Sequence, residues 1–491
     1  MSLESYFSFF RAGIVGIDAE MPLADGTMHR ILYADWTASG RLYRPIEDFM
    51  LGEIGPLVAN THTEATYTGK AMTDAYHDAR TVIKRHVGAS DTDSILFAGS
   101  GMTASVNKLQ RLMGLRMPNR CKGLCRRGEK RPLVLVTHLE HHSNQITWEE
   151  CEVEVLMIPR DPLSGLPDLE ALEKILKNNT DRPLLIGAFS ACSNVTGIIT
   201  PYHRMAAIMH SWGGLCFIDF AASAPYVDIN MHPENPDERL DAITFSPHKF
   251  LGGPGTSGVL ILSNALYSNA VPDQPGGGTV KWTTPFGTHR YLDEIEARED
   301  GGTPGFLQAI RTALAIKVKE EMGTRNILDR ENELKKIFLG ELAGESQIFL
   351  LEPNNLERLG IVSLYSPLTH YNLVVKMLND RYAIQSRGGC SCAGTYGHIL
   401  FGISEPASCR ITDMIDSGDL SDKPGWVRVS LHPTMTDDEA RYTGNAICEI
   451  VRNYREWSGD YLFHKDSGEF FRNDEGTEGA EKARLLDKFK S

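Results

Sequence analysis

Short apolar runs alternate with helix-like segments from about residue 31 to residue 315, and this alternation limits the fold more than any other feature of the sequence. The runs read "LVLVT", "LLIGAF", "LCFID", "AITF" and "GVLIL", and segments such as "GMTASVNKLQRLMGL" and "DLEALEKILKN" separate them. In the first of these segments Met102, Val106, Leu109 and Met113 recur at helical spacing. Strands and helices that alternate in this way predict an α/β domain, with a mostly parallel sheet covered by helices on both faces.

The length of 491 residues suits two or more domains. We expect an N-terminal segment over residues 1–30, a large domain over 31–320, a smaller α+β domain over 321–460 and a charged, loosely packed tail over 461–491. The smaller domain contains the strand-like runs "IVSLYS" and "WVRVSL" and helix-like segments near "HYNLVVKMLNDRY" and "MTDDEARYTGNAICEIVRNY". The stretches "VPDQPGGGTV" and "EPASCRITDMIDSGDLSDKPG" are predicted to be long loops.

Charge and composition exclude several classes of protein. The net charge of −14 argues against a nucleic-acid or acidic-membrane partner. No apolar stretch approaches the ~20 residues of a membrane span, and the N-terminal "MSLESYFSFFRAGIVGIDAE" lacks the basic region of a signal peptide. The odd number of cysteines, nine, fits a reducing compartment better than a disulfide framework. We therefore expect a cytoplasmic protein.

Polar residues follow the apolar runs at positions where ligands bind in open parallel sheets. They are His138–Asn144 after "LVLVT", Ser190–Asn194 at the end of "LLIGAF", Asp219 after "LCFI", and Ser246–Lys249 after "AITF". Singly, a histidine or aspartate at a strand end is more often structural, and a lone loop lysine is usually just exposed. Together they supply what pyridoxal phosphate needs: a lysine of depressed pKa for a Schiff base, an acid for the pyridine nitrogen, a stacking ring and a helix N-terminus for the phosphate.

Several motifs carry a resemblance to a known family. They are "YADWTASG" at the start of the domain, "GMT" at residues 101–103, "EHHSN" at 140–144, "SNVTG" at 193–197, "SPHK" at 246–249, "GGTP" at 301–304 and "VRVSL" at 427–431. On these motifs the chain resembles the class V aminotransferase-fold enzymes, and within them the cysteine desulfurases and selenocysteine lyases, over roughly residues 33–440. The resemblance implies a fold type I transferase that depends on pyridoxal phosphate.

The resemblance also implies a role for each matching residue. Lys249 forms the Schiff base and moves the substrate α-proton, His141 stacks on the ring, Asp219 pairs with the pyridinium nitrogen, and Asn194 hydrogen-bonds the phenolic oxygen. Gly101, Met102, Thr103, Ser246 and His248 hold the phosphate, and Arg428 binds the substrate carboxylate through two bonds. Thr303 reaches the phosphate of a neighbouring subunit, which implies a homodimer. One position departs from the family: Ala222 stands where a glutamine is common.

The stretch "SRGGCSCAGTYGH" decides which reaction is expected. The spacing of Arg387 and Cys392 matches the family's nucleophile motif, and Cys390 is an additional thiol. One alternative is that Cys390 and Cys392 are simply two small buried residues. A metal site is poorly supported, because Cys-x-Cys with one distant His398 lacks a full ligand set. The best-supported reading is a nucleophile in a mobile loop, with Arg387 stabilising the thiolate.

The expected function is therefore a cysteine desulfurase that yields L-alanine and a persulfide on Cys392, and then passes the sulfur to an acceptor, with Cys390 as a relay. The arrangement of thiols is also similar to the desulfurase-like domain of molybdenum cofactor sulfurases. The alternatives are a selenocysteine lyase, a class V aminotransferase, lyase or epimerase acting on another amino acid, and a cofactor-binding protein without turnover.

Overall fold

The computed structural model describes residues 2–61, 63–118 and 130–473. Its centre is a seven-stranded sheet in the order β4-β10-β9-β8-β7-β5-β6. The strands are β4 (Asp93–Ala98), β10 (Gly258–Ser263), β9 (Ala242–Phe245), β8 (Leu215–Asp219), β7 (Leu185–Ser190), β5 (Leu133–Val136) and β6 (Glu154–Met157). The neighbours from β9 to β6 run parallel, which confirms the predicted α/β fold.

Strand β10 is the exception in this sheet, because it pairs antiparallel with both β4 and β9. The segment between β9 and β10 holds only the short 3-10 turn η5 (Pro247–Lys249) and contains no crossover α-helix. Without such a crossover the chain reverses direction after β9, so β10 runs antiparallel to it. As a result β4 ends at the same edge of the sheet as the parallel strands.

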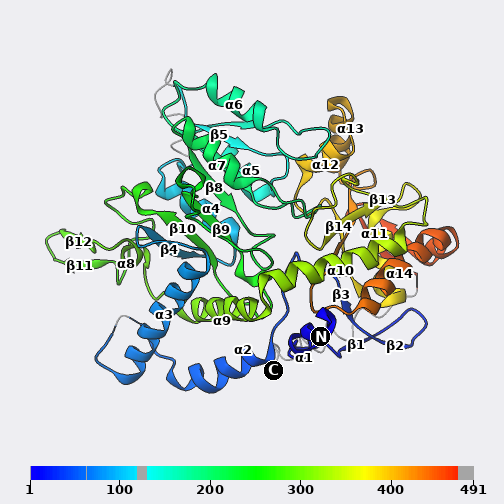
Figure 1. Ribbon diagram of the computed structural model, residues 1–491, viewed down its shortest axis with the longest axis horizontal. Helices are drawn as coiled ribbons and strands as arrows, with labels where there is room; N and C mark the ends of the chain where they lie inside the picture. Colours follow the sequence, from blue (N-terminus) through cyan, green and yellow to red (C-terminus); the bar gives the residue numbers. More distant parts are fainter. Residues whose placement is uncertain (1, 62, 119–129, 474–491) are drawn as a thin grey trace.

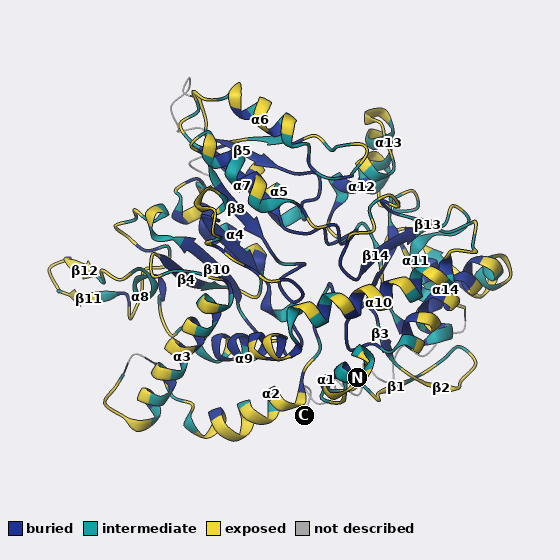
Figure 2. Cartoon of the chain, viewed as in Figure 1, coloured by how far each residue is buried: buried dark blue, intermediate teal, exposed yellow. Residues whose placement is uncertain are grey.

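Helices cover both faces of the central sheet (Figure 1). One face packs against α3 (Tyr67–His86), α6 (Leu169–Lys177), α7 (Tyr202–Ser211) and α9 (Phe306–Met322). The other face packs against α4 (Met102–Leu112) and α5 (His142–Glu149). Figure 2 shows the strands buried between these layers, with α6 exposed on its outer side. Burial on both faces explains why the strands appear in the sequence as continuous apolar runs.

The smaller unit is built on an antiparallel sheet in the order β13-β14-β17-β16. Its strands are β13 (Phe349–Leu350), β14 (Ile361–Tyr365), β17 (Trp426–Ser430) and β16 (Arg387–Gly389). Helices α10 (Thr324–Leu342), α11 (Tyr371–Tyr382) and α14 (Asp437–Trp457) share its apolar core. Figure 1 shows α10 running from the large unit to the small one. A parallel pair of β3 (Leu32–Tyr33) and β15 (Ile384–Gln385) ties the N-terminal part of the chain to the small unit.

Two expectations outside the site differ from the structure. The stretch predicted as a loop after Ser404 contains α13 (Glu405–Asp416), a helix without a buried residue. Its apolar residues Ala407, Ile411, Met414 and Ile415 do recur at helical spacing, but they lie among many polar residues and none is fully buried. The tail predicted to be loosely packed begins with the hairpin β18 (Tyr461–His464) and β19 (Glu469–Arg472), where Tyr461 is buried in the core of the small unit; residues 474–491 lie outside the described part.

The remaining elements are short or peripheral. They are α1 (Leu3–Ala12), β1 (Glu20–Pro22), β2 (Met28–Arg30), α2 (Arg44–Phe49), η1 (Met50–Ile54), η2 (Gly55–Leu57), η4 (Pro236–Glu238), η6 (Asn264–Leu266), β11 (Val280–Thr283), β12 (His289–Tyr291), α8 (Ile295–Glu299), α12 (Gly394–Leu400) and η7 (Ser458–Asp460). Within the described ranges, no helix has the length and apolar character needed to cross a membrane.

Candidate active site

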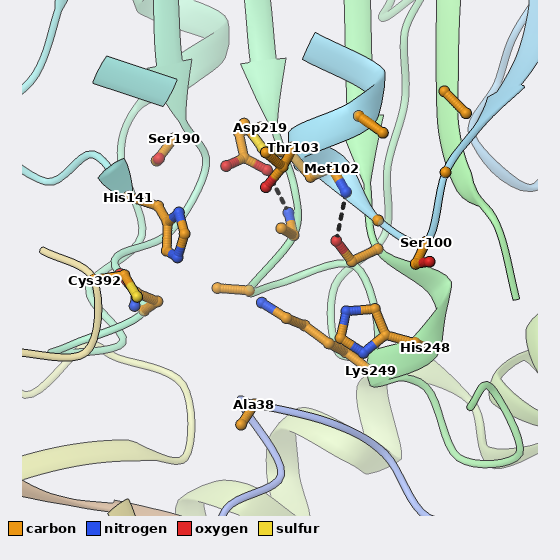
Figure 3. A pocket seen from close by; sticks show the side chains of 18 of the residues that line it. Ala38, Ser100, Met102, Thr103, His141, Ser190, Asp219, His248, Lys249 and Cys392 are labelled. Carbon is orange, nitrogen blue, oxygen red and sulfur yellow. Dashed lines mark hydrogen bonds between the residues drawn. The ribbon is translucent and has the colours of Figure 1, made fainter. Parts of the chain in front are cut away.

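A cavity of about 760 Å³ lies at the edge where the parallel strands end. Figure 3 shows Asp219, Lys249, His141 and Cys392 around this space, with the Lys249 side chain extended into it. All the residues predicted for the site except Thr303 line the cavity: Gly101, Met102, Thr103, His141, Asn194, Asp219, Ser246, His248, Lys249, Arg387, Cys392 and Arg428. The residues chosen because they follow the strand ends thus come from distant parts of the chain and meet at one cavity.

Lys249 ends the short turn η5 that follows β9. A Cβ atom at Gly253 would lie only 1.9 Å from the carbonyl oxygen of Pro247, so a glycine is required for this tight return of the chain. Burial lowers the pKa of Lys249 to about 8, although the charge of Asp219 acts in the opposite direction. A substantial fraction of the side chain is thus a neutral amine near pH 8, which is the nucleophilic and basic form.

Asp219 is the last residue of β8 and is only 6% exposed. Its Oδ1 atom accepts a hydrogen bond from the backbone N–H of Ala221 over 2.8 Å. Burial nevertheless raises the pKa of the carboxyl to about 7. Such a carboxylate is suited to a cationic N–H partner in the cavity, because pairing would offset the cost of burying its charge.

His141 caps the N-terminus of α5, and its Nδ1 atom accepts a hydrogen bond from the backbone N–H of Ser143 over 3.1 Å. Burial, followed by the charge of Lys249, lowers the pKa of His141 to about 4. The ring is therefore neutral at physiological pH, with its proton on Nε2. A neutral ring can stack on an aromatic ligand and exchange a proton through Nε2.

Glu140 precedes His141, and the sequence suggested no role for it beyond the motif. This buried carboxylate accepts hydrogen bonds from the backbone and side chain of both Thr137 and Ser190, and from Asn144 Nδ2. It thereby joins the ends of β5 and β7 and the first turn of α5. The signal that sequence reasoning missed was an acidic residue four positions after a fully apolar strand, in a buried turn where only a well-bonded carboxylate is tolerated.

The N-terminus of α4 forms an anion cradle with the loop after β9. Ser246 Oγ accepts a hydrogen bond from the backbone N–H of Met102 over 2.8 Å, and the hydroxyl groups of Thr103 and Ser143 are 2.7 Å apart. A Cβ atom at Gly101 would lie 3.0 Å from Ser246 Oγ and 3.5 Å from the His248 ring. A side chain at residue 101 would therefore crowd the cradle, and a phosphate group matches its donors and the helix dipole.

Arg428 and Arg387 enter the cavity from the small unit and share one carboxylate. Asp35 Oδ1 accepts from Arg428 Nη2 over 2.8 Å, and Asp35 Oδ2 accepts from Arg387 Nε over 3.0 Å. Arg428 Nη1 also donates to the backbone carbonyl of Asn194 over 3.1 Å. Asp35 belongs to the "YADWTASG" motif, but sequence reasoning assigned it no role, because its partners lie 352 and 393 residues away.

Cys392 is exposed at the cavity, in a loop of unusual backbone conformation. Ser391 and Cys392 have φ angles of 51° and 58°, and two consecutive non-glycine residues in the left-handed region are strained. Three hydrogen bonds hold the loop in place: Asn194 Nδ2 donates to the Ser391 carbonyl over 2.7 Å, the His142 backbone N–H donates to the Cys392 carbonyl over 2.8 Å, and the Gly394 N–H donates to His142 Nε2 over 2.8 Å. Asn194 and His142 of the large unit therefore hold the loop of Cys392 in place at the cavity.

Other thiols and one predicted residue are placed differently. Cys192 also lines the cavity, but complete burial raises the pKa of its thiol, so it is a poor nucleophile. Cys390 is partly buried against an apolar cluster that includes Tyr396 and Trp426. Thr303 does not line the cavity; its hydroxyl donates to Asn60 Oδ1 over 3.3 Å at an exposed position.

The residues present fit pyridoxal phosphate. The cradle around Gly101 suits the phosphate, the buried carboxylate of Asp219 suits a pyridinium N–H, and Lys249 has an amine of lowered pKa. Asn194 Oδ1 is buried without a hydrogen-bond partner in the described structure, which marks a polar group that a ligand can satisfy. Ala222 lines the cavity without offering a polar contact. We infer that these residues hold the cofactor.

Comparison with known proteins agrees with this geometry. The family described as "Aminotransferase class-V" matches residues 32–442. A probable cysteine desulfurase of Aeropyrum pernix is 30% identical over 380 residues, which cover 75% of this chain and 86% of that protein. A probable cysteine desulfurase of Halalkalibacterium halodurans is 28% identical over 341 residues, which cover 68% of this chain and 77% of that protein.

Solved structures show the same fold. The apo structure of a cysteine desulfurase from Thermococcus onnurineus NA1 superposes with a TM-score of 0.70 at 23% identity, and covers 86% of this chain and 95% of that one. The cysteine desulfurase CsdA from Escherichia coli also gives a TM-score of 0.70, at 20% identity, with 91% of this chain and 98% of that one covered. With the family match extending over most of its length, the chain belongs to the class-V aminotransferase family.

Proposed function

We propose that the protein is a pyridoxal-phosphate-dependent cysteine desulfurase, which converts L-cysteine to L-alanine and holds the sulfur as a persulfide on Cys392. The observation that carries this function is the position of Cys392. Its exposed thiol stands at a cavity that also contains Lys249, and the strained loop is fixed to both Asn194 and His142. A family member without thiol chemistry has no need for a strained cysteine at this point.

The cofactor, when bound, supplies an electron sink for negative charge at the substrate α-carbon. Arg428 binds the substrate carboxylate through N–H groups that are left free by Asp35 and Asn194. Lys249, as a neutral amine, takes the α-proton and later returns it. His141, which is neutral with its proton on Nε2, would stack on the cofactor ring and hold that proton ready for the three-carbon fragment.

Cys392 then accepts the sulfur atom. Its thiolate forms a bond to the substrate sulfur as the carbon–sulfur bond breaks, and the electron pair of that bond stays on the three-carbon fragment, which takes up a proton and leaves as alanine. The persulfide passes its outer sulfur to an acceptor thiol by exchange. Arg387, five residues before Cys392, also lines the cavity.

Oligomeric state and location complete the proposal. Thr303 is exposed and outside the cavity of its own chain, which supports a homodimer in which it serves the cavity of the partner. Cys192, Cys216, Cys390, Cys392, Cys409 and Cys448 are free thiols, which fits a reducing compartment such as the cytoplasm.

Incubation of the cofactor-loaded enzyme with L-cysteine tests the function. We expect alanine and sulfane sulfur in equal amounts, with loss of both products in Cys392→Ser. A keto acid without sulfane sulfur would instead identify an aminotransferase. Release of selenium from selenocysteine, with no turnover of cysteine, would identify a selenocysteine lyase.

A further inference from the structure

Two arginines that line the cavity stand opposite each other in one pair of strands. Arg387 of β16 and Arg428 of β17 are register partners in the antiparallel ladder. Like charges directly opposite each other destabilise a sheet. Asp35 lies between them, with one carboxylate oxygen on each guanidinium group at 2.8 and 3.0 Å. The arrangement therefore places a single anion between two cations.

The main chain fixes Asp35 in this position from both sides. Strand β3, which ends two residues before Asp35, pairs with β15, the strand that leads into β16. On the other side Asp35 bridges to Ser430 of β17, whose backbone N–H donates to the carbonyl of Ala34 over 2.7 Å. The carboxylate is thus held by backbone pairing to both strands that carry the arginines.

Burial makes the anion necessary. The side chain of Arg428 is 3% exposed and that of Asp35 is 12% exposed, whereas Arg387 is 49% exposed. Apart from Asp35, Arg428 donates to the Asn194 carbonyl, and its Nε atom is buried without a partner in the described part of the chain. If Asp35 were uncharged, the ligand-free enzyme would contain a buried guanidinium with no counter-ion, which is strongly destabilising.

We propose that Asp35 is the resting counter-ion of this arginine pair and that it sets the charge of the substrate-carboxylate subsite. This inference rests on the proposed binding of the substrate carboxylate by Arg428. Two guanidinium groups and one carboxylate leave a single positive charge, which matches an amino acid that places one carboxylate at this subsite. Asp35 stabilises the free enzyme and shares the arginines with the ligand, so it weakens carboxylate binding and disfavours dianions.

Asp35→Asn in the cofactor-loaded enzyme tests the proposal, because it removes the charge and keeps the shape. Absorbance titrations with L-alanine and with ethylamine, which lacks the carboxylate, measure the two affinities. We expect the affinity for L-alanine to rise roughly fivefold or more while that for ethylamine stays unchanged. A merely structural role of Asp35 predicts that both affinities fall, and that result would overturn the proposal.

Thermal unfolding gives a second readout. The melting temperature of Asp35→Asn should be lower than that of the wild type in sodium chloride, and acetate and succinate at equal ionic strength should restore part of the loss, succinate more strongly. The wild type should show no such preference. A variant whose stability does not respond to carboxylates contradicts the proposed counter-ion role.

Glu439 offers a matched control, because it also accepts hydrogen bonds from two arginines, Arg11 and Arg30, at similar exposure. It does not line the cavity. Glu439→Gln should lower the melting temperature without any change in the ratio of L-alanine to ethylamine affinity. A change in that ratio would mean that the effect of Asp35→Asn is not specific to the subsite.

The double variant Asp35→Asn with Arg387→Gln restores the charge balance. It should regain stability and return the affinity for L-alanine toward that of the wild type. If Asp35→Asn alone does not fold, a soluble, folded double variant supports the proposal. If neither variant folds, the proposal is contradicted. These measurements use ligand binding rather than desulfuration, so they remain readable even if the enzyme does not act on cysteine.

Discussion

Asn194 donates a hydrogen bond from its Nδ2 atom to the backbone carbonyl of Ser391 over 2.7 Å, and so joins the end of β7 to the loop that carries Cys392. One side chain therefore connects the wall of the cofactor cavity with the proposed nucleophile. Its other polar atom, Oδ1, is buried without a partner in the described structure. A ligand that bonds Asn194 Oδ1 would therefore contact the same side chain that holds the Cys392 loop.

The lowered pKa of Lys249 predicts how fast the apoenzyme takes up its cofactor. Only the neutral amine reacts with an aldehyde, and burial brings the pKa down to about 8 from an ordinary value near 10.5. The rate of uptake should therefore rise with pH and level off above pH 8, as followed by the absorbance of the bound cofactor. Borohydride reduction and peptide mapping should place the cofactor on Lys249, and a label on another lysine would refute the assignment.

Asp219→Asn should separate stability from activity. Burial raises the pKa of the folded carboxyl to about 7 from its ordinary value of 3.8, so the unfolded chain binds fewer protons than the folded one between these values. Stability of the apoenzyme consequently falls as the pH rises from 4 to 7. The variant should stabilise the apoenzyme above pH 7 by roughly 2–4 kcal/mol, measured by denaturant unfolding.

The same variant should lose activity, because the pyridine ring has no anion to keep it protonated. We expect turnover to fall about 100-fold or more while the phosphate cradle still binds the cofactor. Near-normal turnover, or an apoenzyme less stable than the wild type above pH 7, would contradict the assigned role.

Gly101→Ala should weaken cofactor binding, because the new Cβ would lie 3.0 Å from Ser246 Oγ inside the cradle. We expect a loss of about tenfold in affinity, or ~1.4 kcal/mol, in a titration of the apoenzyme. Gly340→Ala is the control, since that helical position has open space around it and should leave affinity unchanged. Unaltered cofactor affinity in Gly101→Ala would contradict the assignment of the phosphate site to this cradle.

The fold and much of the site followed from the sequence, because both depend on local patterns. Continuous apolar runs marked the buried strands, and the residues after them, such as Asp219 and Lys249, had to meet at one edge of the sheet. The direction of β10 depends on the absence of a crossover helix, and the few half-buried apolar residues of α13 lie among many polar ones. Asp35 was missed because an ion pair across 393 residues leaves no local signal.

The position of Thr303, exposed and outside the cavity of its own chain, predicts a homodimer. If it serves the cavity of a partner, light scattering should show a dimer, and mixed subunits should complement one another. Lys249→Ala and Thr303→Ala homodimers should both be impaired. A heterodimer of the two contains one cavity with an intact Lys249 and an intact Thr303 from the partner. The isolated heterodimer should therefore have about half of the wild-type activity, and an equal, freely exchanging mixture of the two variants about a quarter. A fully active monomer, or mixing without any recovery, would contradict the arrangement.

The last prediction distinguishes the two thiols of the strained loop. Cys392 is exposed at the cavity, whereas Cys390 packs against the apolar cluster around Tyr396 and Trp426. Cys392→Ala should therefore abolish persulfide formation and most desulfuration, yet still bind cysteine, because Lys249 and Arg428 are unchanged. Cys390→Ala is the matched control; it should keep the persulfide on Cys392 and at most slow its onward transfer. Mass spectrometry after brief exposure to cysteine locates the added sulfur. If the added sulfur is on Cys390 and persists in Cys392→Ala, Cys390 is the nucleophile. If both variants keep their turnover and no persulfide forms, the protein is an aminotransferase or lyase and not a desulfurase.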